Sequence, residues 1–325
     1  MHFTDILPLL ASDAYQTAQQ LSERLQISSS QLADYLFQIR ELGIEIHFSE
    51  NKGYCLKVPL DLINPADIIG ALTPMVAAKL DSHTYLSTTT STNKVALDQS
   101  FPTLGKFSFI TTEMQTKGRG RRGRNWHSPY AQNIYLSIVW PLSADASRAS
   151  TLSPYLALEV VELLDALAVP TLGLKWPNDI VCCNKKISGL LIESVYQSKN
   201  KMYVVIRFGL NVAMKNVQTG DIDQEWTDIT SQFPGWSLSR NNLTAQLINT
   251  LVTALIRFES DGVINLKNRW KHWDIMHNRS VNVSAMDGDT KGIAKGIDED
   301  GSLLLQVDSE QRKIVVGDVS LRALE

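Results

Sequence analysis

A basic, glycine-rich stretch at residues 113–129, EMQTKGRGRRGRNWHSP, constrains the fold more than any other feature of the sequence. Short basic runs usually form solvated loops or nucleic-acid patches, but such runs gain nothing from glycine. Glycine lets backbone N–H groups close around an anion as a concave nest. We therefore expect a loop that binds a phosphate or a carboxylate, without the Lys-Ser/Thr ending of a Walker A loop. Within eight residues it carries Lys117, Arg119, Arg121, Arg122 and Arg124, interleaved with Gly118, Gly120 and Gly123, in a chain of formal net charge −3.

Apolar strands predicted at residues 107–112 and 133–140 hold this loop at both ends and limit where its charges can point. An amphipathic helix is predicted before them at 66–80, followed by a strand that leads into a helix beginning near Asn93. Farther along, the pattern predicts a buried helix at 154–168, strands around 180–182 and 188–195 joined by a turn at 184–186, and a strand at 204–212.

Length and composition bound the class of protein. A chain of 325 residues exceeds what one hydrophobic core usually holds, which predicts two or three domains. No apolar run approaches membrane-spanning length, and the first residues lack the features of a signal peptide, so we expect a cytoplasmic protein without a membrane partner. The three cysteines and six histidines show no metal-ligand spacing, and no protein-held metal is expected.

The first sixty residues are predicted to form a winged helix-turn-helix. Thr17 and Gln20 form a capping pair for one helix, and the serines at 28–30 cap a second, which ends at Gly43. Alternating strands at 44–49 and 54–58 around ENKG would form the wing.

Whether this module binds DNA depends first on charge, because phosphate contacts supply most of the affinity. The second helix carries Asp34, Glu41 and only Arg40 as a cation, and Glu50 offsets Lys52 at the wing tip. A module that only packs against the rest of the chain, or forms a dimer, explains the sequence equally well. Polar side chains can still contact base edges, and the candidate DNA-binding residues are Ser29, Ser30, Gln31, Gln38, Arg40 and Lys52.

Three polar motifs occur in the remainder of the chain, each with an ordinary structural explanation. Ser91-Thr92-Asn93 lies where a strand meets a helix and suits a helix cap. Asn178 and Asp179 follow Trp-Pro and form a rigid polar corner, which fits either a turn or the hydroxyls of a ligand. Lys186 starts a strand and can reach into a site, although a lysine beside another lysine in a turn is usually just exposed.

Taken together, the motifs closely resemble biotin protein ligase. They are Ser91-Thr92-Asn93, Gln115 before GRGRRGRNWHSP, Asn133 to Leu136, KWPND, KKISGLLIE and GLN, in this order and at these distances. The leading module makes the chain similar to the bifunctional members, which are also repressors of the biotin operon. The resemblance implies an α+β multidomain protein: a winged helix-turn-helix at 1–60, a mixed-sheet catalytic domain at 66–275 related to class II aminoacyl-tRNA synthetases and lipoate ligases, and an SH3-like domain at 276–325. Strands are predicted in this last part at 281–285, 291–297, 302–307 and 313–319.

The activity that the resemblance implies has two steps: biotin and MgATP give biotinyl-5′-AMP and pyrophosphate, and a lysine of a biotin carboxyl carrier protein then takes the acyl group. The implied small molecules are biotin, ATP and Mg²⁺, with Mg²⁺ arriving on the triphosphate. Operator DNA and a ligand-linked homodimer are further implied partners. A lipoate or octanoate ligase, and a biotin-sensing DNA-binding regulator without catalysis, remain alternatives.

Site residues carry over from the family by their motifs. Two unit charges about 4 Å apart repel by about 4 kcal/mol at an effective dielectric of ~20, so joining a carboxylate to a phosphate requires cations. The implied catalytic residues are Lys186, Arg119 and Arg121. Biotin would contact these three together with Ser91, Thr92, Asn93, Gln115, Gly118 and Gly120. ATP would contact Arg119, Arg121, Arg122, Trp126, Asn178, Asn211, Trp226 and Arg322, although Trp126 also suits a core or rim position, which we favour for it.

One residue departs from the family pattern in the catalytic part. Where the family commonly has glycine two residues before the glycine of GLN, this chain has Arg207. We expect this bulky cation to crowd a position close to the ligand unless its side chain points away.

Overall fold

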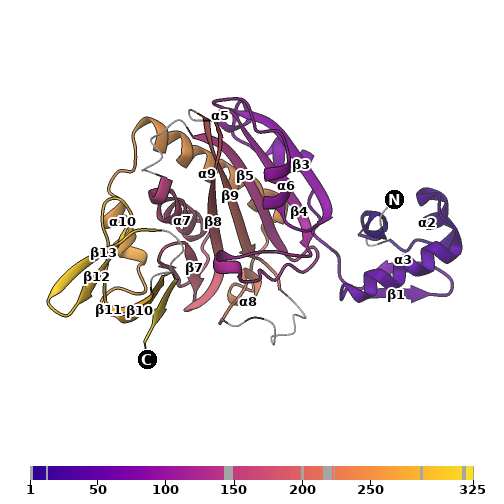
Figure 1. The fold of residues 1–325 in the computed structure, drawn as a ribbon. Helices are drawn as coiled ribbons and strands as arrows, with labels where there is room; N and C mark the ends of the chain where they lie inside the picture. The colour runs from indigo at the N-terminus through magenta and orange to yellow at the C-terminus, as the bar shows by residue number, and fades with distance from the viewer. Residues whose placement is uncertain are drawn as a thin grey trace.

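The protein is described by a computed structural model covering residues 3–11, 14–142, 149–198, 201–214, 222, 224–285, 288–316 and 320–324. A mixed sheet of seven strands, in the order β3-β4-β5-β9-β8-β7-β6, forms its centre (Figure 1). β3 and β4 are parallel, and the other neighbours are antiparallel. The strands are β3 (Leu80–Thr89), β4 (Phe107–Gln115), β5 (Asn133–Leu142), β6 (Leu172–Lys175), β7 (Asp179–Cys182), β8 (Lys185–Ser198) and β9 (Lys201–Asn211).

Helices cover the two faces of this sheet unequally. The long helices α7 (Ala149–Ala166) and α9 (Arg240–Ser260) bury one face in the main hydrophobic core, together with α10 (Leu266–Trp273) (Figure 1). The short helix α6 (Thr92–Asp98) covers part of the other face through a small cluster around Ile110, Val139 and Val205. The rest of that face is left for the glycine-rich loop between β4 and β5.

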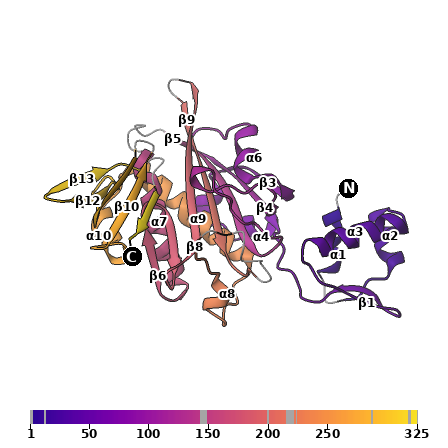
Figure 2. The same cartoon turned by 60° about the horizontal axis from the view of Figure 1, so that its bottom comes forward.

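The N-terminal helices and hairpin stand apart from the main sheet (Figures 1 and 2). The predicted capping pair of Thr17 and Gln20 forms, and of the serines at 28–30 it is Ser28 that caps the next helix: the Thr17 side chain accepts from Gln20 N, and the Ser28 side chain accepts from Gln31 N. The core of this part also takes in Tyr130 from the segment that leaves the glycine-rich loop. Its elements are η1 (Phe3–Ile6), α1 (Leu7–Leu10), α2 (Ala18–Leu25), α3 (Ser29–Glu41), β1 (Ile46–Ser49) and β2 (Gly53–Leu56).

A buried ion pair fastens the connecting segment to the sheet. Glu113 on β4 and Arg240 at the start of α9 form an ion pair of 2.8 Å, with 0% and 3% of their side chains exposed. The other carboxylate oxygen of Glu113 accepts from Ile63 N, and the Arg240 guanidinium donates to Asn133 O. The chain that leaves β2 is thus held at the base of the central sheet.

The C-terminal strands form an antiparallel sheet in the order β13-β12-β11-β10-β14. Its buried residues belong to the same core as α7 and α9, and Gly301 O accepts from Trp176 Nε1 at 2.9 Å. None of the helices in the described ranges combines the length and apolar character that a membrane span requires. The strands are β10 (Ser280–Ala285), β11 (Gly288–Ile297), β12 (Leu303–Val307), β13 (Glu310–Ile314) and β14 (Ser320–Ala323).

Several predicted elements differ from the structure. The single helix expected at 66–80 is wrong: α4 (Pro65–Gly70) and α5 (Pro74–Ala77) are separate, because Pro74 lacks the N–H that would continue the first helix. α7 begins before its predicted start. The turn of the β7–β8 hairpin is Cys183-Asn184, both with positive φ as a two-residue turn requires, so Lys186 lies within the strand. The strand predicted at 313–319 ends at Ile314, and residues 317–319 lie outside the described part.

Candidate active site

The glycine-rich loop forms a tight hairpin that folds over the open face of the sheet. Gly120 N donates to Arg124 O at 2.7 Å, and Trp126 N donates to Gly118 O at 2.9 Å. The amides of Gly120 and Trp126 therefore serve the loop itself, which departs from the anion nest that the glycines predict. Gly118 is required for close packing, since a Cβ there would lie 2.5 Å from Trp126 O.

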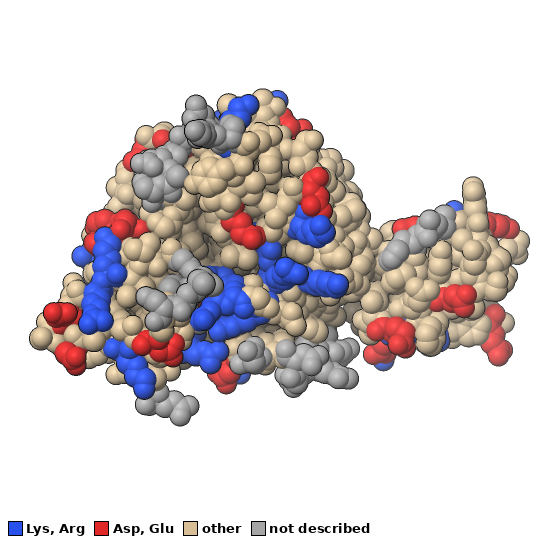
Figure 3. Space-filling model, viewed as in Figure 1, with Lys and Arg blue, Asp and Glu red and all other residues tan. Residues whose placement is uncertain are grey.

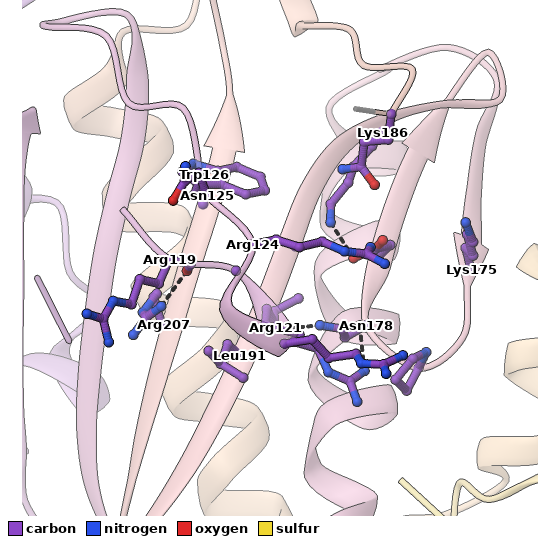
Figure 4. A pocket seen from close by; sticks show the side chains of 18 of the residues that line it. Arg119, Arg121, Arg124, Asn125, Trp126, Lys175, Asn178, Lys186, Leu191 and Arg207 are labelled. Atoms are coloured by element: carbon purple, nitrogen blue, oxygen red, sulfur yellow. Dashed lines mark hydrogen bonds and ion pairs between the residues drawn. The ribbon is translucent and has the colours of Figure 1, made fainter. Parts of the chain in front are cut away.

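The loop roofs a cavity of about 340 Å³ on the sheet (Figures 3 and 4). Lys and Arg side chains gather in this hollow, as Figure 3 shows. Among the described residues that line it, the only acidic one is Asp179. The cations come from the loop, from three strands of the main sheet and from the C-terminal sheet, and are Arg119, Arg121, Arg122, Arg124, Lys175, Lys186, Arg207 and Arg322.

Lys186 points into the cavity from β8 (Figure 4). Its ammonium lies 2.7 Å from Asp179 Oδ1 and 5.5 Å from the centre of the Trp126 ring. Its backbone is fixed as well, because Lys186 N donates to Glu225 O and Thr227 N donates to Lys186 O. Gly189 leaves space for the lysine stem, which a Cβ there would approach to 3.2 Å. The lysine is thus held in place opposite the loop arginines.

The Ser91-Thr92-Asn93 triplet and Gln115 lie at one end of the site. Thr92 is fully buried, and its amide and hydroxyl both donate to Gln115 Oε1, at 3.0 and 3.3 Å. Thr92 therefore orients Gln115, and its direct contact with a ligand stays a prediction. Ser91 and Asn93 line an adjoining hollow together with Arg119. Within the described part of the chain, Ser91 Oγ and Asn93 Oδ1 are buried without a hydrogen-bond partner.

The remaining predicted site residues surround the same cavity or its margin. Arg121 donates to Asn178 Oδ1 at 3.1 Å, and Arg122 donates to Ser284 O on β10 at 3.4 Å. Arg322, on β14, lines the cavity from the C-terminal sheet. Asn211 and Trp226 line a second adjoining hollow that also includes Lys186, Gln115 and Gly118.

Trp126 lies between the loop and the sheet. Its ring packs on Gly209, where a Cβ would come within 2.6 Å of the indole. The ring also lies under the Lys186 ammonium, at a distance suited to a cation–π contact. Trp126 is thus a lining residue that shapes the cavity.

Sequence reasoning missed Lys175, which lies at the end of β6 and lines the cavity. Burial lowers the pKa of its ammonium; the carboxylate of Asp179 raises it, and the nearby Lys186 lowers it further. The sequence feature that could have identified Lys175 as a cavity residue is its position directly before Trp176-Pro177. The six candidate DNA-binding residues lie apart from this cavity, on α3, at its N-terminus and at the β1–β2 turn.

Comparisons with known proteins agree with this geometry. The model of the biotin/lipoate A/B protein ligase family matches residues 85–211, and the model of the biotin protein ligase C-terminal domain matches residues 276–322. The protein named bifunctional ligase/repressor BirA of Escherichia coli (strain K12) is 34% identical over 320 residues, covering 98% of this chain and 97% of that relative. Its namesake in Bacillus subtilis (strain 168) is 26% identical over 315 residues, covering 96% and 95%.

Solved structures extend the similarity to the fold. A biotin protein ligase from Aquifex aeolicus, solved in complex with biotin and ATP, superposes with a TM-score of 0.62 at 24% identity. The match covers 75% of this chain and all of that one. The central mixed sheet and the C-terminal antiparallel sheet thus have the arrangement of this fold.

Proposed function

The chain belongs to the biotin protein ligase family, and from this premise we propose that it activates biotin with ATP and transfers it to a lysine of a biotin carboxyl carrier protein. In the first step a biotin carboxylate oxygen attacks the α-phosphorus of ATP, the bond to the β-phosphate oxygen breaks, and pyrophosphate leaves. In the second step the neutral amine of the carrier lysine attacks the acyl carbon, loses its proton, and AMP leaves.

The observation that carries this proposal is the ring of cations around one cavity. The reacting carboxylate and α-phosphate repel each other, by about 4 kcal/mol for two unit charges about 4 Å apart at an effective dielectric of ~20. Arg119 and Arg121 on the loop line the same cavity as Lys186. We assign these three residues to the carboxylate, the phosphates and the charge that develops as pyrophosphate leaves. The side chains supply position and charge, while the bonds change within the substrates.

Buried polar atoms support binding of the biotin head at the α6 end. Ser91 Oγ and Asn93 Oδ1 lack partners within the described residues, and a buried unsatisfied polar atom costs about 1–3 kcal/mol. A ureido group offers both donors and an acceptor, so it can satisfy such atoms. Thr92 holds the Gln115 amide in a fixed orientation for the same group. Gly118, Gly120 and Arg119 of the loop then cover the ligand.

Gly209→Ala is expected to weaken biotin binding by about 5-fold to 150-fold. The added methyl group would meet the Trp126 ring at 2.6 Å, and overpacking of this kind costs about 1–3 kcal/mol. The dissociation constant of biotin, measured by titration calorimetry, checks the prediction. Gly70→Ala is the matched control, because nothing lies within 4 Å of its added Cβ. Equal affinities of the two variants would contradict this role of Gly209.

The nucleotide is proposed to bind at the other side of Lys186. Arg122, Asn178 and Arg322 approach the cavity from three different elements, and Trp226 offers a ring on which adenine can stack. Trp126 and Asn211 border the same space. Mg²⁺ would arrive bound to the phosphates, because the only carboxylate among the described residues that line the cavity, Asp179, is already paired with Lys186. It would neutralise phosphate charge.

Labelling of a carrier protein tests the proposed function directly. Purified protein, biotin, MgATP and a biotin carboxyl carrier domain are expected to give a biotinylated carrier, detected with streptavidin. A carrier whose acceptor lysine is changed to arginine should stay unlabelled. If biotin binds but neither pyrophosphate exchange nor labelling occurs, the protein is a biotin sensor without catalysis. If lipoate or octanoate replaces biotin in the exchange, the ligand assignment is wrong.

A second function, biotin-responsive repression, is favoured by the N-terminal helices and hairpin. We propose that they form a winged helix-turn-helix with α3 as the recognition helix, as the relatives named ligase/repressor suggest. Ser29, Ser30, Gln31, Gln38 and Arg40 lie on exposed positions of α3, and Lys52 lies at the turn of the hairpin. A shift of the operator DNA by this protein, stronger with biotin and ATP and weaker with salt, is the expected result. No shift at low salt would exclude the role.

The proposed domains are 1–60, 66–275 and 276–325, with the last as an SH3-like barrel and the second related to class II aminoacyl-tRNA synthetases. Each range contains its own sheet, which supports the division. A repressor that binds two half-sites acts as a dimer. Sedimentation with biotin and ATP is therefore expected to show a dimer that is reduced or absent without them.

A further inference from the structure

Arg207, on β9, places a cation on the floor of the cavity. Two residues farther along the same strand is Gly209. Side chains two residues apart on a strand share one face, so Arg207 and Gly209 face the loop together. In the sheet Arg207 lies between Ser137 on β5 and Leu191 on β8. Its side chain is 11% exposed. Burial lowers the pKa of its guanidinium, while Glu193 raises it. A buried cation in this position requires partners.

Its contacts connect three separate elements, and Figure 4 shows the contact with Arg119. One guanidinium nitrogen, Nη1, donates to the main-chain carbonyl of Arg119 in the middle of the loop. The other, Nη2, lies 3.5 Å from Glu193 Oε2 on β8. The same carboxylate oxygen accepts from Asn93 Nδ2 on α6 at 2.6 Å. A continuous chain of contacts therefore runs from α6 through β8 and β9 to the loop.

The contact with the loop differs from the loop's other attachments. Thr116 N and Lys117 N bind Thr89 O and Thr90 O, which holds only the base of the loop. Arg121 and Arg122 attach the loop through their own side chains, which donate to Asn178 Oδ1 and Ser284 O. Arg207 instead holds a backbone carbonyl at the centre of the loop from a rigid central strand. It therefore fixes the path of the main chain.

We infer that Arg207 is a positioning residue that holds the glycine-rich loop closed over the cavity before any substrate binds. When the loop is already ordered, binding of biotin does not include the free-energy cost of ordering it, so biotin binds more tightly. Glu193, itself held by Asn93, keeps the guanidinium aimed at the loop. The statement about biotin rests on the proposed function, whereas the statement about the loop does not.

Hydrogen exchange of the protein without ligands tests the loop directly. Arg207→Met keeps the length of the side chain and removes the donors. Amides in the segment 117–126 are expected to exchange about tenfold to a hundredfold faster, which is the range that a charge-assisted hydrogen bond accounts for. Arg312→Met, on the exposed edge strand β13, is the matched control for loss of one positive charge. Arg207→Lys should restore part of the protection, since it keeps a cationic donor.

Substrate binding provides the second measurement. In Arg207→Met the dissociation constant of biotin should rise by a similar factor, while kcat at saturating biotin and ATP changes by less than about threefold. In Arg207→Met the Glu193 carboxylate loses its cationic partner. The double variant Arg207→Met with Glu193→Gln removes that carboxylate charge as well, and it should show the same exchange rates and the same dissociation constant as Arg207→Met.

Two results would overturn the inference. Loop amides that exchange as in the unmodified protein would show that Arg207 does not hold the loop. Faster exchange shared by the amides of β5 would show a general loss of stability instead. If the unmodified protein neither binds biotin nor exchanges pyrophosphate, the ligase proposal fails, and the exchange of the loop still decides the role of Arg207.

Discussion

Lys186→Gln is expected to slow formation of the adenylate by about 10²–10³-fold, the loss typical when one preorganised group that stabilises transition-state charge is removed. The ammonium is held by Asp179 and by the Trp126 ring, and its backbone is fixed by two hydrogen bonds to the strand-like segment at 225–227. It is therefore placed before substrate arrives. Glutamine keeps much of the volume and a donor but removes the charge.

The measurement is biotin-dependent exchange of pyrophosphate into ATP. Lys185→Gln is the matched control, because it removes the same charge from the adjacent, exposed position of β8 and should leave the exchange rate nearly unchanged. Thermal unfolding of both variants should remain cooperative. A Lys186→Gln protein that exchanges pyrophosphate like Lys185→Gln would exclude the assigned role.

Glu113→Ala is expected to lower the free energy of unfolding by about 3–5 kcal/mol, the usual cost of leaving one member of a buried ion pair alone. The Arg240 guanidinium is 3% exposed and would keep only carbonyl partners. The same substitution frees Ile63 N, so the connecting segment also loses its attachment to β4. One carboxylate thus contributes both to stability and to the attachment of the connecting segment.

Urea denaturation, monitored by tryptophan fluorescence, measures this loss. Glu45→Ala is the control: Glu45 pairs with Lys57 at the surface, where such pairs contribute about 0–1 kcal/mol. Replacing both buried partners, in Glu113→Leu with Arg240→Met, should recover much of the stability, because no uncompensated charge remains. A loss below about 1 kcal/mol for Glu113→Ala would show that the pair is not essential.

The sequence predicted best those elements that depend on residues close together in the chain. The capping boxes at Thr17 and Ser28 depend on side chains three residues apart, and both form. The helix expected at 66–80 is interrupted for an equally local reason, since Gly70 is a poor helix former and Pro74 lacks the N–H that would continue the helix. The strands that flank the glycine-rich loop were found because their apolar runs are nearly continuous.

Side-chain roles in the site depend on contacts that no local pattern contains. Thr92 belongs to a motif that is predicted to bind the ligand, yet its hydroxyl donates to Gln115, which follows 23 residues later. Lys175 lines the cavity because β6 pairs with β7, a register that composition does not reveal. Arg207 was identified as a departure from the family pattern, but its contact with Arg119 requires the folded loop.

The order of strands in the central sheet has a consequence for synthesis of the protein. β5 ends at Leu142, and its partner β9 begins only at Lys201. At about 5–20 residues per second, a ribosome takes roughly 3–12 s to make the intervening segment. During that time β5, which is buried along its whole length in the folded protein, has an unpaired edge. Binding of a chaperone to the nascent chain is therefore expected to peak in this interval and to end when β9 emerges.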